Sequence, residues 1–152
     1  MKVTEWDRRI DPSSVRVGIA VSDFNLVVTK RLLDGALAYL EHVGVGKVDV
    51  LRVAGAWELA VAAATLFNEG CHGVIALGAV IKGETDHYDV IVRESASGLT
   101  GAALQAGRPI GNAVLAAHDL EQALARSEAG PANKGAEAAA ALVDLVCKMG
   151  IS

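Results

Sequence analysis

Residues 73–81 read GVIALGAVI, and this stretch is the most strand-like run in the chain. It is almost continuously apolar and lacks the polar–apolar alternation of a strand with one wet face. Such runs are typical of strands buried on both faces, as in parallel sheets. The stretch VRVGIAVS at residues 15–22 has the same character. Both runs therefore predict strands that are covered by other elements on each side.

The regions around these two runs alternate between helix and strand patterns. After residues 15–22, Asn25 is an expected helix cap. Apolar residues then recur at helical spacing from Val28 to Leu40, and Gly44 ends this helix. Further strands are expected at residues 47–53 and 109–116, and further helices at residues 57–69, 88–106, 119–126 (capped by Asp119) and 134–149. This order predicts a parallel sheet with helices on both faces, and right-handed crossovers narrow it to a doubly wound α/β fold.

The composition indicates one globular domain over residues 1–152, with 52% hydrophobic and 21% charged residues. The net charge of −4 argues against a nucleic-acid partner. No apolar run approaches the ~20 residues of a membrane span, and residues 1–12 lack the apolar core of a signal peptide. Cys71 and Cys147 lie far apart without a CxxC motif. They are expected to be reduced core thiols of a cytoplasmic protein.

In doubly wound folds, ligands bind beyond the carboxyl ends of the strands. This rule directs attention to four places in the sequence. They are Phe24, residues 55–58, residues 81–87 and residues 112–117.

The loop KGETDH at residues 82–87 combines three features that are useful to catalysis. Gly83 lets the backbone approach a ligand closely. The start of the following helix can hold an anion. His87 brings an imidazole, which can act as a general acid or base near neutral pH. A solvated surface loop is the alternative interpretation. His87 has no second His or Cys at ligand spacing, so no metal site is expected.

Other side chains near these places also allow two interpretations each. Arg126 and Lys134 flank the bend at residues 127–133 and could bind a phosphate, or could be exposed charges at helix ends. Glu58 could accept hydrogen bonds from a polyol, or could simply favour the dipole at a helix start. Phe24 could stack on a flat heterocycle, or could anchor the core.

The positions of the remaining histidines favour a functional role less strongly than that of His87. His42 suits the dipole at the end of a helix, His72 begins a strand, and His118 lies just beyond a strand end, where it could line a site. The chain contains no GxGxxG, GxxxxGK[ST] or GxSxG motif. Neither nucleotide binding nor an activated serine nucleophile is therefore indicated.

Five motifs, in order and at matching spacings, resemble the lumazine synthase family. They are DFN at residues 23–25, GAWE at 55–58, LGAVIKGETDHY at 77–88, EQALAR at 121–126 and NKG at 133–135. The resemblance extends from residue 15 to about residue 149. It implies a three-layer α/β/α sandwich on a four-stranded parallel flavodoxin-like sheet.

The resemblance also implies a reaction. The family condenses 5-amino-6-ribitylaminouracil, a ribitylaminopyrimidine, with 3,4-dihydroxy-2-butanone 4-phosphate to give 6,7-dimethyl-8-ribityllumazine, phosphate and water. An imine forms, phosphate is eliminated and the ring closes, with neither a metal nor an organic cofactor. Each step moves protons, so one base is useful throughout. Holding two substrates together supplies much of the remaining acceleration.

Matched by motif position, the resemblance assigns roles to individual residues. His87 would be the proton shuttle. Phe24 would stack on the pyrimidine ring, while Val80 and Ile81 would present backbone groups to it. Three consecutive residues would hold the ribityl chain, the last of them taking its hydroxyls: Ala56, Trp57 and Glu58.

Four residues would hold the phosphate: Glu84, Thr85, Arg126 and Lys134. In the family the site lies between neighbouring subunits, so Asn112, Arg126 and Lys134 would come from the adjacent chain. Members form pentamers, and some assemble twelve pentamers into a hollow shell. The bend governs this assembly, and its length here matches that of shell-forming members. The resemblance thus implies a homo-oligomer, at least a pentamer, that acts on small molecules.

The sequence departs from the family pattern at several positions. Asn112 replaces a frequent aromatic residue that covers the heterocycle, so stacking on that side is lost. The other departures replace common proline, arginine or threonine residues, and they are Ala54, Ala60, Lys82, Ala116 and Ala117. Because His87, Glu58 and Arg126 are retained, we expect these changes to affect affinity more than chemistry.

Two other functions are compatible with the same fold. An archaeal-type riboflavin synthase would dismutate two lumazines, but the loop from Gly83 to His87 and the presence of Arg126 favour lumazine synthase. A non-catalytic paralogue would act as a shell or as a binder of ribityl ligands, its activity lost through Asn112 and the alanine replacements. Such a protein would bind lumazine or flavin and make no product.

Overall fold

The protein is represented by a computed structural model that describes residues 1–83 and 87–151. The strands are β1 (Arg16–Ser22), β2 (Lys47–Val53), β3 (Gly73–Ile81) and β4 (Ile110–Ala117). The helices are α1 (Leu26–Val43), α2 (Leu59–Asn68), α3 (His87–Ala106), α4 (Leu120–Arg126) and α5 (Lys134–Met149). Two short 3-10 turns, η1 (Pro12–Ser14) and η2 (Ala56–Glu58), precede β1 and α2.

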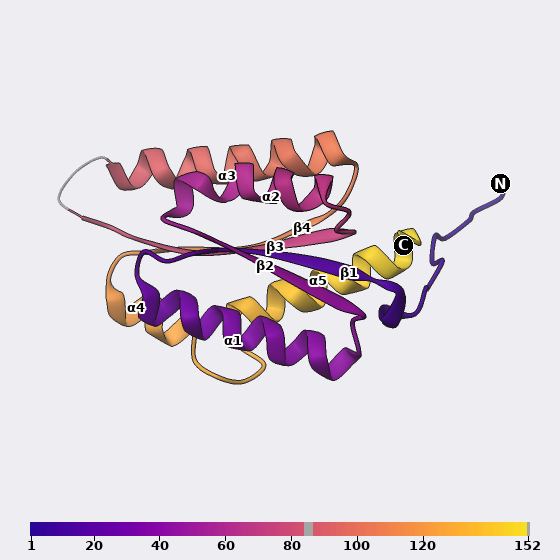
Figure 1. Cartoon of the computed structure of the whole chain (residues 1–152), viewed down its shortest axis with the longest axis horizontal. Coiled ribbons are helices and arrows are strands. Elements are labelled where there is room, and N and C mark those ends of the chain that lie inside the picture. Colours follow the sequence, from indigo (N-terminus) through magenta and orange to yellow (C-terminus); the bar gives the residue numbers. More distant parts are fainter. Residues whose placement is uncertain (84–86, 152) are drawn as a thin grey trace.

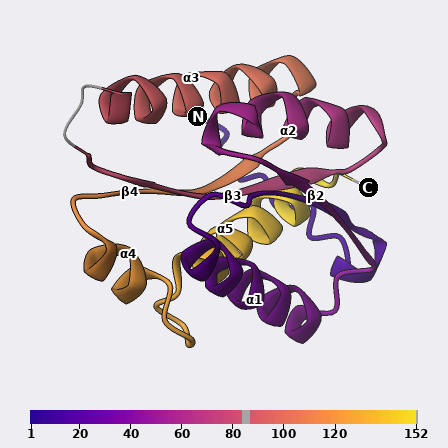
Figure 2. The same ribbon diagram turned by 60° about the vertical axis from the view of Figure 1, so that its left-hand side comes forward.

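The four strands form one parallel sheet in the order β2-β1-β3-β4. Helices α2 and α3 cover one face of this sheet, and α1, α4 and α5 cover the other (Figure 1). Figure 2 shows the same three layers from a second direction. The predicted three-layer α/β/α sandwich with a flavodoxin-like parallel sheet is therefore confirmed.

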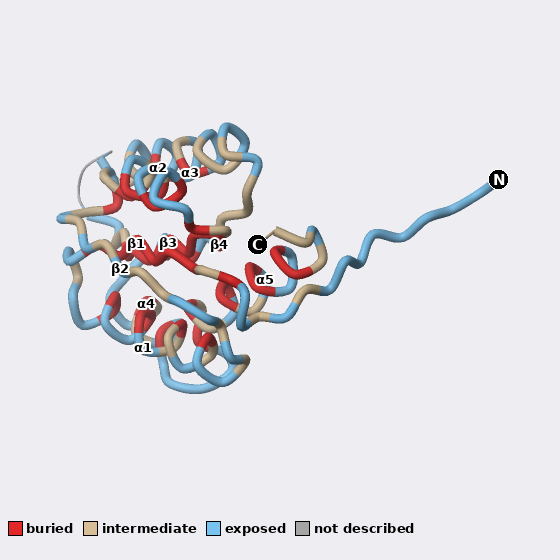
Figure 3. The backbone as a smooth tube through the Cα atoms, turned by 45° about the vertical axis from the view of Figure 1, so that its right-hand side comes forward, coloured by how far each residue is buried: buried red, intermediate tan, exposed pale blue. Residues whose placement is uncertain are grey.

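The core consists of two apolar clusters, one on each face of the sheet. On β1, Val17, Ile19 and Val21 are fully buried in the cluster shared with α1 and α5. Ala20 belongs to the opposite cluster, which contains Leu59 of α2. Successive side chains of a strand point to opposite faces, so the continuous apolar run supplies both clusters. Figure 3 shows the buried residues concentrated along the central strands.

Helices α1 and α5 pack closely because each has a glycine where the other helix or its preceding residue approaches. A Cβ on Gly135 of α5 would collide with the backbone carbonyl oxygen of Leu32 in α1. A Cβ on Gly35 of α1 would collide with the side-chain oxygen of Asn133, which precedes α5. Larger residues at either glycine would force the two helices apart.

Several element boundaries differ from the sequence-based expectation by one or two residues. Helix α1 begins at Leu26, ahead of the periodic pattern. The helix expected at residues 57–69 begins as the turn η2 before it becomes α2. Such shifts are usual, because helix ends are set by capping contacts and not by the apolar period.

The expected caps had different outcomes. Asp119 caps α4 as predicted, since its Oδ1 accepts a hydrogen bond from the backbone N–H of Gln122 at 2.8 Å. The prediction that the Asn25 side chain caps α1 was wrong. Asn25 precedes α1 in a left-handed conformation (φ 61°, ψ 51°), and its side chain makes no capping bond. Its Nδ2 donates instead to the carbonyl oxygen of Ala79 at 2.9 Å, because β3 ends beside it.

The amino-terminal edge of the sheet carries a polar cluster. The guanidinium Nε of Arg16 donates to Asp49 Oδ2 at 2.6 Å and holds the pKa of that carboxyl below its ordinary value. The backbone N–H of Arg16 donates to His72 Nδ1 at 2.8 Å. Burial lowers the pKa of His72, and the charges of Arg108 and Arg16 lower it further. His72 therefore lies at the strand start, as expected, and serves as a hydrogen-bond acceptor.

Two further features lie away from the sheet. Residues 1–9 are exposed and run away from the rest of the chain (Figure 3), anchored where the backbone N–H of Arg8 donates to the carbonyl oxygen of Lys148 at 3.0 Å. Cys71 and Cys147 are buried free thiols in different apolar clusters, and burial raises the pKa of both. Among the helices described, none is long and apolar enough to cross a membrane.

Replacing His72 with asparagine should weaken the dependence of stability on pH. The folded state favours neutral His72, whereas the unfolded chain binds its proton at the ordinary pKa of 6.5. The stability that His72 contributes is therefore present above that value and is lost as pH falls towards the lowered folded-state pKa. An asparagine oxygen can accept the same bond without titrating.

Urea unfolding at about pH 7.5 and about pH 5.5 measures this effect. We expect the free energy of unfolding to fall less in His72→Asn than in the unmodified protein. His42→Asn, at the exposed end of α1, is the control and should behave like the unmodified protein. An equal fall in His72→Asn would contradict the assignment.

Candidate functional site

A cavity of about 430 Å³ lies at the carboxyl edge of the sheet, on the side of α2 and α3. Its lining comes from the segments that follow β1, β2 and β3 and from the first turns of α3. The lining residues are Phe24, residues 54–58, residues 79–81, Gly83, His87, Tyr88 and Ile91. Three of the four places indicated by the strand-end rule thus meet in one cavity.

Phe24 is held at the mouth of this cavity by its backbone. The N–H groups of Asp23 and Phe24 donate to the carbonyl oxygens of Val53 and Ala54, at 2.8 and 2.9 Å. The Phe24 side chain is 70% exposed, so it is not a core anchor. An exposed aromatic ring on a fixed backbone at the cavity is suited to stacking on a flat ligand.

The turn η2 supplies one wall, and its geometry is set by Glu58. One carboxylate oxygen, Oε2, accepts a hydrogen bond from the backbone N–H of Gly55 at 3.0 Å. The turn buries Ala56 and leaves Trp57 59% exposed on the cavity side. A carboxylate has two oxygens, so Oε1 of Glu58 can still accept hydrogen bonds from a ligand.

The end of β3 forms the floor of the cavity. Val80 and Ile81 are half-buried and pair with Ala116 and Ala117 of β4. The bond from Asn25 Nδ2 to the Ala79 carbonyl holds the loop after β1 against this floor. The backbone of the two strand ends is therefore fixed where a ligand would lie.

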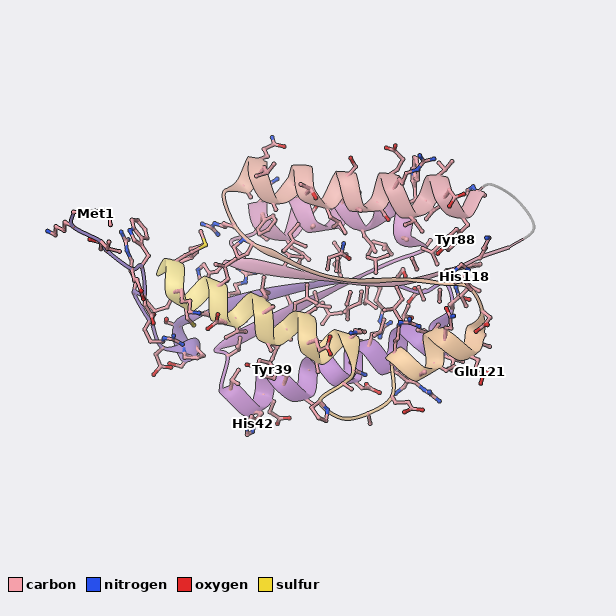
Figure 4. All side chains as sticks on the ribbon, turned by 180° about the vertical axis from the view of Figure 1, so that it is seen from behind. Met1, Tyr39, His42, Tyr88, His118 and Glu121 are labelled. Carbon is pink, nitrogen blue, oxygen red and sulfur yellow. The ribbon has the colours of Figure 1, made fainter. Side chains whose placement is uncertain are left out.

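His87 is the first residue of α3, and its exposed side chain lines the cavity. Tyr88 and Ile91 follow on the same helix, one turn apart. Their contribution was not predicted, although a helix starting at the cavity places residues three and four apart on one face. Figure 4 shows Tyr88 at the same end of the sheet as His118. Glu84 and Thr85, the expected phosphate contacts from this loop, lie outside the described residues.

The other predicted site residues lie elsewhere in the chain. Among the described residues that line the cavity, Asn112, Arg126, Lys134 and His118 do not appear. Asn112 is exposed on the edge strand β4, where its Oδ1 accepts from the backbone N–H of Val114 at 2.9 Å. Within a single chain, His87, the expected proton shuttle, thus lies in the cavity, whereas Arg126 and Lys134, the two residues expected to bind the phosphate, lie outside it.

The two cations lie at helix ends on the opposite layer. Arg126 ends α4, and its exposed guanidinium donates to the Gln122 carbonyl oxygen at 3.3 Å. Lys134 begins α5, and its Nζ is 2.9 Å from Glu137 Oε2. The partner of each side chain is an exposed group three or four residues away on the same helix. Binding a phosphate would therefore break no buried contact.

A larger cavity, about 830 Å³, lies between α1 and the bend before α5. It includes Tyr39 and His42, which Figure 4 shows on α1, together with Glu128 and Pro131 of the bend. No sequence motif pointed to it, and it is away from the carboxyl edge where α/β folds bind ligands. We therefore place the candidate site in the smaller cavity, where the motifs meet.

The smaller cavity can hold a flat heterocycle with a polyol arm. Phe24 offers an aromatic face, the backbone of β3 offers a fixed edge, and Glu58 offers an acceptor for hydroxyls. His87 can give or take a proton at a ligand in the same space. Residues 1–83 and 87–151 contain no group of three or more His, Cys, Asp or Glu side chains that could hold a metal ion.

The chain is similar to proteins of one named family. The sequence profile of 6,7-dimethyl-8-ribityllumazine synthase matches residues 14–149. The enzyme of that name from Xanthomonas euvesicatoria pv. vesicatoria (strain 85-10) is 40% identical over 147 residues, 95% of this chain and 96% of the relative. The one from Nitratidesulfovibrio vulgaris (strain DP4) is 38% identical over 141 residues, 91% and 90% of the two chains. The chloroplastic one from Spinacia oleracea is 40% identical over 134 residues, 87% of this chain and 60% of the relative.

Glu58→Ala should destabilise the wall of the cavity by about 1 kcal/mol, the net value of a typical hydrogen bond. The substitution leaves the Gly55 N–H without its partner. Glu58→Gln keeps an oxygen that can accept this bond and should unfold at nearly the same urea concentration as the unmodified protein. Equal stability of all three proteins would show that the bond does not hold the turn.

Proposed function

The chain belongs to the 6,7-dimethyl-8-ribityllumazine synthase family, and from this premise we propose how its residues carry out the reaction. The protein is a transferase of riboflavin biosynthesis that condenses 5-amino-6-ribitylaminouracil with 3,4-dihydroxy-2-butanone 4-phosphate. The observation that carries the proposal is the cavity of about 430 Å³ that gathers Phe24, Glu58 and His87 from three strand ends.

The pyrimidine would bind first to the fixed parts of this cavity. Phe24 stacks on the ring, and the backbone of Val80 and Ile81 faces its polar edge. The ribityl chain runs along η2, where Trp57 covers it and Glu58 Oε1 accepts from its hydroxyls. Ala56 is buried and sets the close approach of the backbone. In this pose the reacting amine would face His87.

His87 would move the protons of the condensation. The amine attacks the ketone carbon, and the resulting alcohol leaves as water when the imine forms. A proton is then taken from the carbon next to the imine as phosphate leaves, and the resulting enol takes up a proton to become a methyl ketone. The second amine attacks this ketone and closes the ring with loss of water. An imidazole can take and return a proton in each step, which suits one residue to all of them.

The phosphate would be held by a shared site. Arg126 can grip it as a planar fork and Lys134 as a point charge, with Glu84 and Thr85 from the loop before α3. Because neither cation lines the cavity of its own chain, we propose that the adjacent subunit supplies both, together with Asn112. One complete site then consists of the cavity at the carboxyl ends of the strands in one subunit and of the ends of α4 and α5 that the adjacent subunit supplies.

This shared site requires an assembly, and we propose a homo-oligomer of at least a pentamer, with a twelve-pentamer shell as its larger form. Trp57, Val61 and Leu104 are large apolar residues that are more than half exposed in the single chain, as subunit contacts would require. We further propose that residues 1–152 act as one lumazine-synthase-like domain in the cytoplasm. Its two buried free thiols suit a reducing compartment.

Mixing the purified protein with both substrates and following lumazine formation optically tests the function directly. We expect product well above the uncatalysed rate. Conversion of lumazine alone to riboflavin would indicate a riboflavin synthase instead. Tight binding of lumazine without product, from a folded and assembled sample, would indicate a non-catalytic binder.

His87→Ala should slow turnover by roughly 10²-fold or more, within the usual contribution of a general acid or base. Steady-state kinetics with both substrates saturating measures this. His42→Ala, at the exposed end of α1, is the matched control and should retain the full rate. Unchanged turnover in His87→Ala would remove the residue from its role.

Arg126→Ala should raise the KM for the phosphorylated ketone by roughly 10-fold or more, the value of a charge-assisted hydrogen bond. The KM for the pyrimidine should change little, because the pyrimidine carries no phosphate. Lys148→Ala removes one exposed cation from the far end of α5 and is the control. If both KM values in Arg126→Ala match those of the control, Arg126 does not bind the phosphate.

A further inference from the structure

Asn133 lies between the two proposed phosphate cations and is 1% exposed. It immediately precedes Lys134 at the start of α5. Its side-chain Nδ2 donates to the carbonyl oxygen of Ser127, the residue that follows Arg126, at 2.9 Å. One buried amide therefore links the residue that follows Arg126 to the residue that precedes Lys134.

The same amide also reaches a third element. Its Nδ2 donates to the carbonyl oxygen of Arg31 in α1 at 3.1 Å, and its Oδ1 accepts from the backbone N–H of Ala136 in α5 at 3.1 Å. With the bond to Ser127, the side chain connects the end of α4, the start of α5 and the first half of α1. The bend at residues 127–133 is thus closed on itself and attached to the helical layer.

The Asn133 amide packs closely against two glycines. Gly35 of α1 has no side chain, and a Cβ there would collide with Asn133 Oδ1. A Cβ on Gly135 would lie 3.0 Å from the same oxygen. Ser127, also fully buried, donates its hydroxyl to the Ala123 carbonyl oxygen at 2.9 Å and fixes its own end of the bend. The two glycines therefore make the room in which the Asn133 amide forms its hydrogen bonds.

We propose that Asn133 is a positioning residue for the substrate phosphate, acting by fixing the relative placement of Arg126 and Lys134. This inference rests on the proposed function, which assigns the phosphate to these two cations. Long cationic side chains lose considerable freedom when they grip an anion, and a rigid backbone beneath them lowers that cost. Without the amide, the two helix ends would lose the side chain that bonds to both of them.

Helix capping alone does not account for these contacts. A capping side chain needs only an acceptor for a first-turn N–H, and serine is as effective as asparagine there. The two Nδ2 bonds, to Ser127 and to Arg31, contribute nothing to the cap. Asn133→Ser therefore removes the connection between the helix ends while it keeps an acceptor for Ala136.

The test compares Asn133→Ser with the unmodified assembled protein and with Val143→Ala, which weakens the buried face of α5 far from its start. Two quantities are measured on each: the KM for each substrate, and the Kd for inorganic phosphate by titration calorimetry. In Asn133→Ser we expect the KM for the phosphorylated ketone and the phosphate Kd to rise together by about 10-fold, the value of one charge-assisted hydrogen bond. The KM for the pyrimidine should stay within about twofold of the unmodified value, since its proposed contacts at Phe24 and Glu58 are untouched.

Each outcome decides between the alternatives. Equal phosphate affinity in Asn133→Ser and the unmodified protein would overturn the proposal, as would an equal loss in Val143→Ala, which would indicate general destabilisation. Phosphate affinity that falls only in Asn133→Ser, in a protein that makes no lumazine, would support the positioning role and refute the proposed reaction. An unmodified protein that binds no phosphate would overturn both.

Discussion

The parallel pairing of β1 with β3 is the constraint on which the rest of the structure depends. Two parallel neighbours require crossover helices, and right-handed crossovers place α1 and α2 on opposite faces of the sheet. The strand order reverses between these two strands, which opens a crevice at their carboxyl ends. The bond from Asn25 to the Ala79 carbonyl spans that crevice, so the place where the topology opens is also held at a fixed width.

The candidate chemistry divides between the two layers of helices. The aromatic ring, the carboxylate and the imidazole lie on the side of α2 and α3, where the segments after β1, β2 and β3 converge. Arg126 and Lys134, the two cations proposed to bind the phosphate, lie at the end of α4 and the start of α5, on the opposite face of the sheet. The two cations are not among the described residues that line the cavity of their own chain, and assembly of subunits is the physical means by which this fold would complete the site. Catalysis and oligomerisation would then be inseparable.

Close packing in the layer of α1, α4 and α5 would also help to hold the proposed phosphate-binding residues in place. Glycines at positions 35 and 135 let α1 and α5 approach until a single buried amide can bond to three elements. A bend that would otherwise be a loose connection becomes a rigid support for charges on the surface. The packing of this layer therefore depends on a few atoms around Asn133, and under the proposed function the binding of the phosphate would depend on them as well.

Local sequence patterns determined most of the fold. Continuous apolar runs identified the strands, helical periodicity and Asp119 identified the helices, and the strand-end rule led to Phe24, Glu58 and His87, because these signals depend on neighbouring residues alone. Only the tertiary structure decided what depends on distant contacts. Asn25 bonds across the sheet instead of capping its helix, because β3 ends beside it. Phe24 is exposed at a cavity mouth, and Asn133 joins segments up to 102 residues apart, since such contacts exist only once the layers have packed.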